Sequence, residues 1–317
     1  MPDSKKFTVQ WGGKDLIIET GVFANQANGS CTVQYGDTVV LASACMSESV
    51  REGLDFFPLQ VEYEERFYAA GRIKGSRFMK KEGRPTDEAI LVARYIDRAV
   101  RPLFDDRMRN EIQVVVTCLQ FDGENDPDII GLIAASCALH ISDIPWDGPI
   151  ADIRIGQIEG EWVINPSYDA RKKSALDLSF AGTSDKVIMI EAGCDQVPEA
   201  TALDAFAFGS KHLAAPVKLI EEARAALGKK KRDMVSPKND DEKAKFEKRD
   251  KIQAIARPFL VKAVNELFFA TPQATKVERA KQKSELKKRC EAFLLTQGVE
   301  AADVKLGTSI AEEVLEA

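Results

Sequence analysis

The sequence predicts an α+β core followed by an all-α domain, and three observations carry this prediction. Up to about residue 212, short β-rich runs alternate with longer apolar runs at helical spacing. After Gly228 the strand signal nearly disappears, and Lys, Glu, Ala and Leu dominate. The length of 317 residues suits two domains. We therefore expect a core domain over 1–228 and an all-helical domain over 229–317.

The strands of the core are predicted from β-rich runs that flank glycine turns. Gly12-Gly13 separates the first two runs and Gly36-Asp37 the next two, which is the pattern of β-hairpins. The expected strands are 7–11, 16–18, 31–35, 38–44, 59–63, 112–121, 150–158, 162–164, 176–180 and 186–190. We expect these strands to pair in one sheet, with the helices on its face.

The helices are predicted from apolar residues at helical spacing. The core should contain helices at 87–100, 128–142 and 198–212, the last continuing to about 227, and the second part should contain helices at 240–256, 257–270, 275–297 and 307–317. No Gly or Pro follows the last helical run, so we expect the chain to be part of a longer protein.

Composition excludes several classes of protein. Apolar residues make up 44% and charged residues 30%, which excludes a wholly disordered chain. No apolar run approaches the roughly 18 residues of a membrane span, and the N-terminus lacks the apolar core of a signal peptide. The six cysteines lie far apart without a CxxC pair, which favours reduced, buried thiols. We therefore expect a cytoplasmic protein that has no membrane partner.

The charge of the chain is unevenly distributed. The formal net charge is -6, which by itself argues against a nucleic-acid partner. Residues 66–109, however, contain twelve basic and six acidic residues, so this segment carries +6 and the rest of the chain -12. The average therefore hides one basic segment.

The first half of this segment is predicted to be a glycine-rich loop that displays cations beside large apolar side chains. Gly71, Gly75 and Gly83 make the loop flexible. Its tip is Arg77-Phe78-Met79-Lys80-Lys81. Apolar groups on which bases stack, next to cations that bind phosphates, suit single-stranded nucleic acid. The alternative is a solvated charged loop with one anchoring phenylalanine.

The second half is the predicted helix 87–100, on which three arginines share a face. At 100° per residue, Arg94, Arg98 and Arg101 fall within about 60° of one another. The opposite side is apolar and should pack on the sheet; it carries Val92, Ile96, Ala99 and Val100. Three arginines on one face of a helix favour a surface that binds a polyanion. The alternative is a structural role, in which Asp97 pairs with one of them.

Long motifs in the first part resemble the polynucleotide phosphorylase family. They are AAGRIKGSRFMKKEGRP, the helix that ends in IDRAVRPLF, NDPDIIGLIAASCALHISDIPWDGPI, DFFPLQVEYEER and LDLSFAGTSDKVIMIEAG. Together they cover most of residues 1–212, and the helical part to 317 resembles the helical domain between the two cores of the family. The loop tip departs from the family, since Phe78-Met79-Lys80-Lys81 stands where many members carry two aromatics and two arginines.

The resemblance implies a fold and a reaction. The fold would be a ribonuclease PH-like core (ribosomal protein S5 domain 2-like), the first of two cores in a subunit that forms a homotrimeric ring. The parent enzyme would be a polyribonucleotide nucleotidyltransferase active in mRNA degradation. It would use inorganic phosphate and Mg²⁺ or Mn²⁺ to degrade single-stranded RNA from the 3′ end, and it could join proteins of an RNA-degradation complex.

The residues also indicate which core this is. Where the active core of the family has a Gly-Ser-Ser turn for phosphate, this chain has three carboxylates in 124–128. Of the two metal-binding aspartates of that core, Asp177 matches one, and Arg171 stands in place of the other. We therefore expect no catalytic residue and no metal site here, only ring assembly and RNA contacts. The expected RNA-binding residues are Arg72, Arg77, Phe78, Met79, Lys80, Lys81, Arg84, Arg94, Arg98 and Arg101.

Two other functions remain open at this point. One is a free-standing, non-catalytic RNA-binding ring subunit of an exosome-like assembly, which the helical domain disfavours. The other is a small-molecule enzyme of the same α+β fold. His140 and His212 are interpreted as structural, because neither has a nearby Ser or Cys in a recognised pattern. The basic run 229–232 is interpreted as a solvated charge run, with RNA contact as the alternative.

Overall fold

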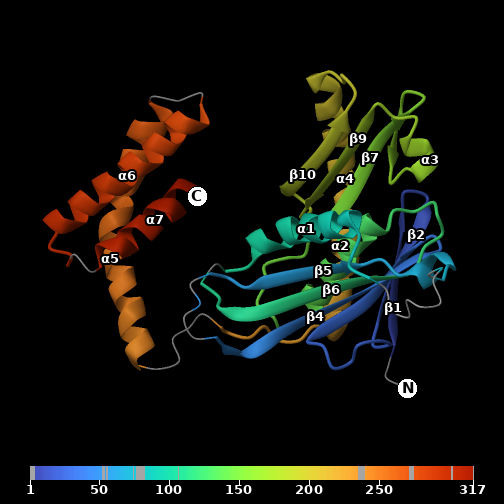
Figure 1. The fold of residues 1–317 in the computed structure, drawn as a ribbon, viewed down its shortest axis with the longest axis horizontal. Helices are drawn as coiled ribbons and strands as arrows, with labels where there is room; N and C mark the ends of the chain where they lie inside the picture. The colour runs from blue at the N-terminus through green and yellow to red at the C-terminus, as the bar shows by residue number, and fades with distance from the viewer. Residues whose placement is uncertain are drawn as a thin grey trace. The chain divides into compact units, whose positions relative to one another are not determined.

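The computed structural model describes residues 4–51, 54, 56–73, 75, 83–105, 107–234, 240–270, 275–300 and 303–316. It divides into two compact units, Met1–Val235 and Ser236–Ala317 (Figure 1). The first unit mixes strands and helices and the second is helical over its described residues, which confirms the predicted α+β core followed by a helical region.

The strands of the first unit form two sheets, so the prediction of one sheet is wrong. The larger sheet has the order β1-β2-β3-β4-β6-β5, antiparallel except for the parallel pair β5–β6. Its strands are β1 (Lys5–Trp11), β2 (Lys14–Thr20), β3 (Gly29–Tyr35), β4 (Thr38–Val50), β5 (Leu59–Glu64) and β6 (Asn110–Gln120). Gly12 and Gly36 sit at the two tight turns with φ of 59°, the left-handed conformation that glycine adopts without strain.

The smaller sheet is antiparallel throughout, in the order β10-β9-β7-β8. Its strands are β7 (Ala151–Ile158), β8 (Glu161–Ile164), β9 (Leu176–Gly182) and β10 (Val187–Cys194). The short helix α3 (Tyr168–Arg171) connects β8 to β9. The two sheets cover both sides of helix α2 (Pro127–Ile141), which is largely apolar and buried along nearly its whole length.

Helix α2 lies between the sheets and forms the centre of the core. It contacts β3, β4 and β6 of the larger sheet and β7 of the smaller one (Figure 1). Helix α4 (Glu199–Leu227) packs on α2, β7 and β1, and it runs unbroken through Pro216, as the predicted continuation to 227 required. At Gly209 an added Cβ would lie 2.8 Å from the Phe180 ring, so glycine allows α4 to approach the smaller sheet closely.

Helix α1 (Asp87–Val100) covers β5 with its apolar side, as predicted. Ile96, Ala99 and Val100 are fully buried. The Thr86 hydroxyl accepts a hydrogen bond from the backbone N–H of Ala89 and caps the start of the helix. The short 3₁₀ helix η2 (Arg101–Leu103), which contains Pro102, follows its end.

The basic run 229–232 folds onto the first unit, and much of it is not solvated as expected. The Lys231 ammonium donates to the carbonyl of Leu139 (2.7 Å), and the backbone N–H of Lys229 donates to that of Ile141 (2.9 Å). The Arg232 guanidinium pairs with Asp143 at 2.5 Å. The Lys231 ammonium and the Lys229 N–H thus bind carbonyls of the last turn of α2, which have no N–H partner within the helix.

The second unit is built from α5 (Asp240–Val264), the π-helical turn η3 (Asn265–Phe269), α6 (Lys276–Thr296) and α7 (Val304–Glu316). The sequence predicts a break near residue 256, but α5 continues through Pro258. Its buried residues Ile252, Ala256, Leu260 and Ala263 keep helical spacing across the proline, so burial of this face holds the helix together.

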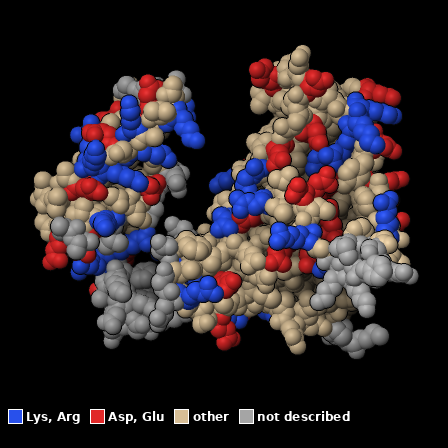
Figure 2. All heavy atoms as spheres, viewed as in Figure 1, with Lys and Arg blue, Asp and Glu red and all other residues tan. Residues whose placement is uncertain are grey.

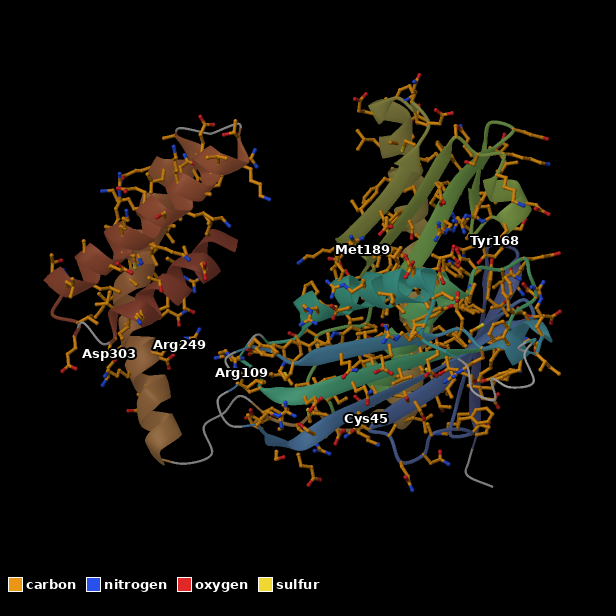
Figure 3. All side chains as sticks on the ribbon, viewed as in Figure 1. Cys45, Arg109, Tyr168, Met189, Arg249 and Asp303 are labelled. Atoms are coloured by element: carbon orange, nitrogen blue, oxygen red, sulfur yellow. The ribbon has the colours of Figure 1, made fainter. Side chains whose placement is uncertain are left out.

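Among the described residues, no helix is long and apolar enough to cross a membrane. All six cysteines are free, and four of them are buried; Cys45 and Cys194 are exposed. Cys45 lies on β4 (Figure 3). His140 is buried beside Glu221, with 3.2 Å between Nε2 and the carboxylate, and burial lowers its pKa to about 4. This environment fits the structural role expected for His140.

Candidate functional site

A cavity of about 930 Å³ opens in the first unit between α1, the 3₁₀ helix η1 (Phe67–Ala70) and the smaller sheet. Its lining also includes the first residues of α2 and residues of α3. The fold therefore brings residues of both sheets to one place. The volume lies in the range of small-molecule binding sites.

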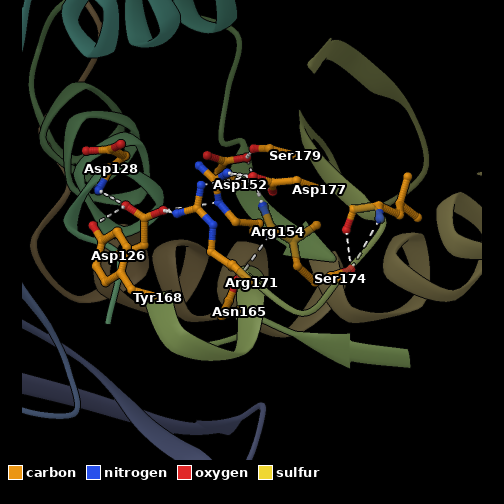
Figure 4. A network of polar contacts seen from close by, with 12 residues as sticks. Asp126, Asp128, Asp152, Arg154, Asn165, Tyr168, Arg171, Ser174, Asp177 and Ser179 are labelled. Atoms are coloured by element: carbon orange, nitrogen blue, oxygen red, sulfur yellow. Dashed lines mark hydrogen bonds and ion pairs between the residues drawn. The ribbon is translucent and has the colours of Figure 1, made fainter. Parts of the chain in front are cut away.

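Two arginines and two aspartates form a closed ring of ion pairs at this cavity (Figure 4). Arg154 of β7 contacts Asp126 through Nε at 3.1 Å and Asp177 through Nη1 at 2.8 Å. Arg171 of α3 contacts the same two carboxylates, each at 2.9 Å. Arg154, Arg171 and Asp177 line the cavity, and Asp126 is buried. The cations of the ring are thus neutralised by carboxylates of the same chain.

The ring fixes the charged state of its members. Burial acts to lower the pKa of Arg154, but Asp126 and Asp177 raise it above its usual range. Burial likewise acts to raise the pKa of Asp177, whereas the charges of Arg154 and Arg171 hold it below its usual range. Arg154 and Asp177 therefore stay charged at neutral pH, and each charge has a partner.

The N-terminus of α2 is capped by carboxylates of the chain itself. The Asp126 carboxylate accepts a hydrogen bond from the backbone N–H of Asp128 at 3.1 Å. The Asp122 carboxylate accepts from the N–H groups of Glu124 and Asn125, both at 2.8 Å. A free helix N-terminus attracts phosphate. Here acidic side chains already occupy that position.

Asp128 differs from the charged carboxylates around it. Burial, reinforced by the neighbouring charge of Asp126, raises its pKa to about 8. One of the three carboxyl groups in 124–128 is therefore protonated at neutral pH, a state that the sequence analysis did not foresee. Its neutral carboxyl lines the cavity as a donor and an acceptor of hydrogen bonds.

The residues around Asp177 do not fit a divalent cation. A magnesium site needs free carboxylate oxygens, but those of Asp177 contact Arg154 and Arg171. Within the described ranges, no cluster of three His, Cys, Asp or Glu side chains is placed to hold a metal. The guanidinium of Arg171 occupies the space beside Asp177 that the resemblance assigns to a second metal-binding aspartate in the active core.

A second polar cluster lies against the ring. The Tyr95 hydroxyl donates to the buried Asp152 carboxylate at 2.7 Å and also contacts the Ser179 hydroxyl. Burial raises the pKa of Asp152 well above its usual range. Tyr95 and Ser179 line the cavity, so they add neutral polar groups to it.

The three arginines predicted to share a face lie in different environments, and Arg101 follows the end of α1. Arg94 is exposed, and no hydrogen bond or ion pair to it is found among the described residues. Arg98 is also exposed and pairs with Glu191 of β10 at 2.8 Å. Arg101 pairs with Asp97 at 2.7 Å and donates to the carbonyl of Leu59 at 3.1 Å. The outward stripe expected from the sequence is therefore incomplete, because Arg101 is bound to the start of β5.

The remaining predicted RNA-binding residues belong to the loop between η1 and α1. Arg72 and Arg84 are exposed, and Arg72 also lines the cavity. Arg77, Phe78, Met79, Lys80 and Lys81 lie outside the described residues. Positive and negative side chains alternate over the visible face of the first unit near α1 (Figure 2), so exposed basic groups here have acidic neighbours.

Sequence reasoning missed Arg154, the residue that joins the ring. The side chains of β7 alternate, and both neighbours of Arg154, Ile153 and Ile155, are fully buried. A single arginine between two isoleucines of a predicted strand, in ADIRIGQI, was an available signal, because a charge there needs a buried partner.

Two models of protein families match the first unit, one over each of its two sheets. Residues 12–145 match the model of the 3′ exoribonuclease family, domain 1, and residues 148–212 match that of domain 2. The chain belongs to the 3′ exoribonuclease family. The two matches adjoin near residue 146, just before β7 begins the smaller sheet.

Similar family members include polyribonucleotide nucleotidyltransferases of several bacteria. The protein of Alkaliphilus oremlandii is 47% identical over 232 residues, covering 73% of this chain and 33% of its own length. That of Halothermothrix orenii is 46% identical over 258 residues, covering 80% and 36%. The chain thus spans about a third of the length of these relatives, and its first unit is a ribonuclease PH-like core of their type.

A solved structure supports the fold. Rice (Oryza sativa) Rrp46 superposes with a TM-score of 0.51 over 72% of this chain and 95% of its own, at 14% sequence identity. At this identity, the similarity concerns the fold of the core alone.

Proposed function

We propose that this chain is part of an enzyme that degrades single-stranded RNA from the 3′ end by phosphorolysis and releases nucleoside diphosphates. Family membership and identities near 47% to polyribonucleotide nucleotidyltransferases support this activity for the parent protein. Phosphate, the attacking group, and a divalent cation, Mg²⁺ or Mn²⁺, would act in another part of that protein. No protein nucleophile is needed; the enzyme positions phosphate and stabilises the charge that develops.

We further propose that the core described here is not catalytic. The ring of Asp126, Arg154, Asp177 and Arg171 carries this proposal. An attacking phosphate needs cations or N–H groups that are free to bind it. In this ring both arginines are bound to carboxylates, and Asp126 caps the Asp128 N–H at the start of α2.

The role proposed for this core is RNA binding and assembly. Arg72, Arg84, Arg94 and Arg98 offer exposed cations for the RNA backbone, together with the loop 77–81. Arg101 would contribute indirectly, by fixing the end of α1. We place the parent protein in a cytoplasmic homotrimeric ring that degrades mRNA, in contact with other RNA-degradation proteins.

A stand-alone ring subunit of an exosome-like assembly is the weaker alternative. The relatives at 43–49% identity are polyribonucleotide nucleotidyltransferases in which the match covers 32–36% of the length, which favours one part of a larger enzyme. The helical second unit, which follows the core, also disfavours a free-standing subunit.

A salt titration tests the RNA contacts. Binding of a labelled oligo(A) is measured between low and moderate salt for the wild type and for Arg94→Ala with Arg98→Ala. Each lost phosphate contact should lower the slope of log affinity against log salt by about 0.7, because fewer counterions are released. The same reasoning applies to Lys80→Ala with Lys81→Ala.

Lys218→Ala is the control for loss of a positive charge elsewhere on the surface, since Lys218 is exposed on α4 and lies outside the cavity lining and the predicted RNA contacts. This variant should keep the wild-type affinity and slope. If the arginine variant also keeps both, α1 does not contact RNA.

A further inference from the structure

We propose that the 930 Å³ cavity of the first unit binds a ribonucleobase, presented either by a free nucleoside or by an unpaired nucleotide of RNA. The RNA source rests on the proposed function, whereas the nucleoside source does not. Four features of the cavity carry the inference: its size, its uncovered apolar side chains, its neutral polar groups and the neutralised state of Arg154 and Arg171.

Apolar side chains of the cavity are exposed to solvent. Leu91 on α1 is 68% exposed and Phe67 on η1 is 45% exposed, and both line the cavity. The rings of Phe121 and Tyr168, also in the lining, meet edge to face with centroids 5.9 Å apart. A flat ring in the cavity would remove apolar surface from water, and aromatic side chains bind bases by stacking.

The polar groups that line the cavity favour an uncharged ligand. Asp128 presents a neutral carboxyl, because burial raises its pKa to about 8. A neutral carboxyl offers one donor and at least one acceptor side by side, and the edge of a nucleobase offers the complementary pair. Ser179 and Tyr95 add hydroxyl groups within the same lining.

The charged groups argue against an anionic ligand. Arg154 and Arg171 are each bound to Asp126 and Asp177, so an added phosphate would have to break existing ion pairs. Arg72 is the exposed arginine of the lining and is suited to the ribose or backbone end of the ligand. The base, and not the phosphate, therefore fits the interior.

The test measures binding of adenosine, cytidine, guanosine and uridine to the 317-residue chain by calorimetry or ligand-observed NMR. Inorganic phosphate and ribose 5-phosphate serve as probes without a base. We expect at least one nucleoside to bind and both base-free probes not to bind. The proposal is overturned if no nucleoside binds, or if a base-free probe binds equally well.

A blocking variant locates the site. Ala192 is exposed on β10 and lines the cavity, so Ala192→Trp should fill it and weaken nucleoside binding at least tenfold. Ala225→Trp is the matched control, because Ala225 is exposed on α4 outside the lining. Equal binding by the wild type and Ala192→Trp would place the ligand elsewhere and overturn the proposal.

Two substitutions at Asp128 test the polar contact even if Ala192→Trp does not fold. Asp128→Asn keeps a neutral donor and acceptor and should retain binding, whereas Asp128→Leu should lose it by tenfold or more. Urea unfolding checks that both variants fold. Loss of binding in Asp128→Asn would show that an ionised carboxylate is required, contrary to the proposal.

Competition with oligo(A) separates the two sources of the base. If oligo(A) displaces the nucleoside in the wild type, the base can come from RNA; if it does not, the site serves free nucleosides. Nucleoside binding does not depend on the proposed RNA contacts of α1, so Arg94→Ala with Arg98→Ala should leave it unchanged. Failure of RNA binding with intact nucleoside binding would therefore contradict the proposed function and leave this site standing.

Discussion

At the scale of single residues, Arg154 determines what the inner part of the cavity can bind. Its side chain is 14% exposed and holds the carboxylates of Asp126 and Asp177. An arginine between two aspartates gives each carboxylate a partner and leaves no free charge for phosphate or metal. The same contacts make Arg154 important for stability.

Arg154→Met should destabilise the first unit by about 3 kcal/mol, because it leaves buried Asp126 with one cation instead of two. Urea unfolding measures the change. Lys172→Met is the control, since Lys172 pairs with Asp169 in an exposed position and should cause no detectable loss. Equal stability of the wild type and Arg154→Met would show that the ring contributes nothing.

Asp128 should make the protein less stable as the pH rises from about 4 to about 8. Its pKa in the folded chain, about 8, lies above that of an unfolded aspartate, about 3.9. Over this window the folded state holds a proton that the unfolded state releases, so the free energy of unfolding falls with pH.

Asp128→Asn removes this titration and should be increasingly stabilising, relative to the wild type, between pH 5 and pH 8. Asp152 is also buried with a raised pKa and acts in the same direction, but it is present in both proteins and cancels in the comparison. The midpoints of urea unfolding of the wild type and Asp128→Asn, measured at pH 5 and pH 8, show the change in stability. A stability difference that does not grow with pH contradicts the protonated state of Asp128.

At the scale of elements, the C-terminal end of α2 is covered by the last turn of α4 and the basic run 229–232. Arg224 donates to the carbonyl of His140 at 2.7 Å, and Lys231 to that of Leu139 at 2.7 Å. Positive charge at a helix C-terminus is favourable because the helix dipole is negative there. The basic run therefore caps α2 and fixes the course of the chain after α4.

Lys231→Ala should lower the free energy of unfolding by about 1 kcal/mol, because the Leu139 carbonyl loses one hydrogen bond and keeps the Ser142 hydroxyl as its donor. The neighbouring Lys230→Ala is the control: Lys230 is exposed, so its substitution should leave the free energy of unfolding unchanged. Urea unfolding of the two variants measures both free energies. If both behave alike, the run acts as a solvated charge cluster, as the sequence alone indicated.

The elements themselves were largely predictable from local patterns. The turns at Gly12 and Gly36 and the capped helix α1 follow from residues adjacent in sequence, and all are present. The division into two sheets was not predictable, because it depends on which strands cover each side of α2. The ring around Arg154 was missed for the same reason: β7, α2 and α3 meet only in the folded chain.

At the scale of the whole molecule, the charge distribution and the site give a consistent account. The segment 66–109 carries +6 on a chain of net charge -6. One of its exposed arginines, Arg72, lines the cavity in which Arg154 and Arg171 are neutralised by carboxylates. A core that binds RNA without cleaving it would need this combination, with solvent-exposed cations outside and buried, paired charges where the reaction would occur.

Phosphorolysis by the 317-residue chain tests this account most directly. The chain is incubated with poly(A), inorganic phosphate and Mg²⁺, and ADP release is measured beside that of a longer protein that carries a second core. Because the carboxylate-bound arginines cannot receive phosphate, we predict no ADP from the chain and steady release from the longer protein. Robust ADP release by the 317-residue chain would contradict the assignment of this core as non-catalytic.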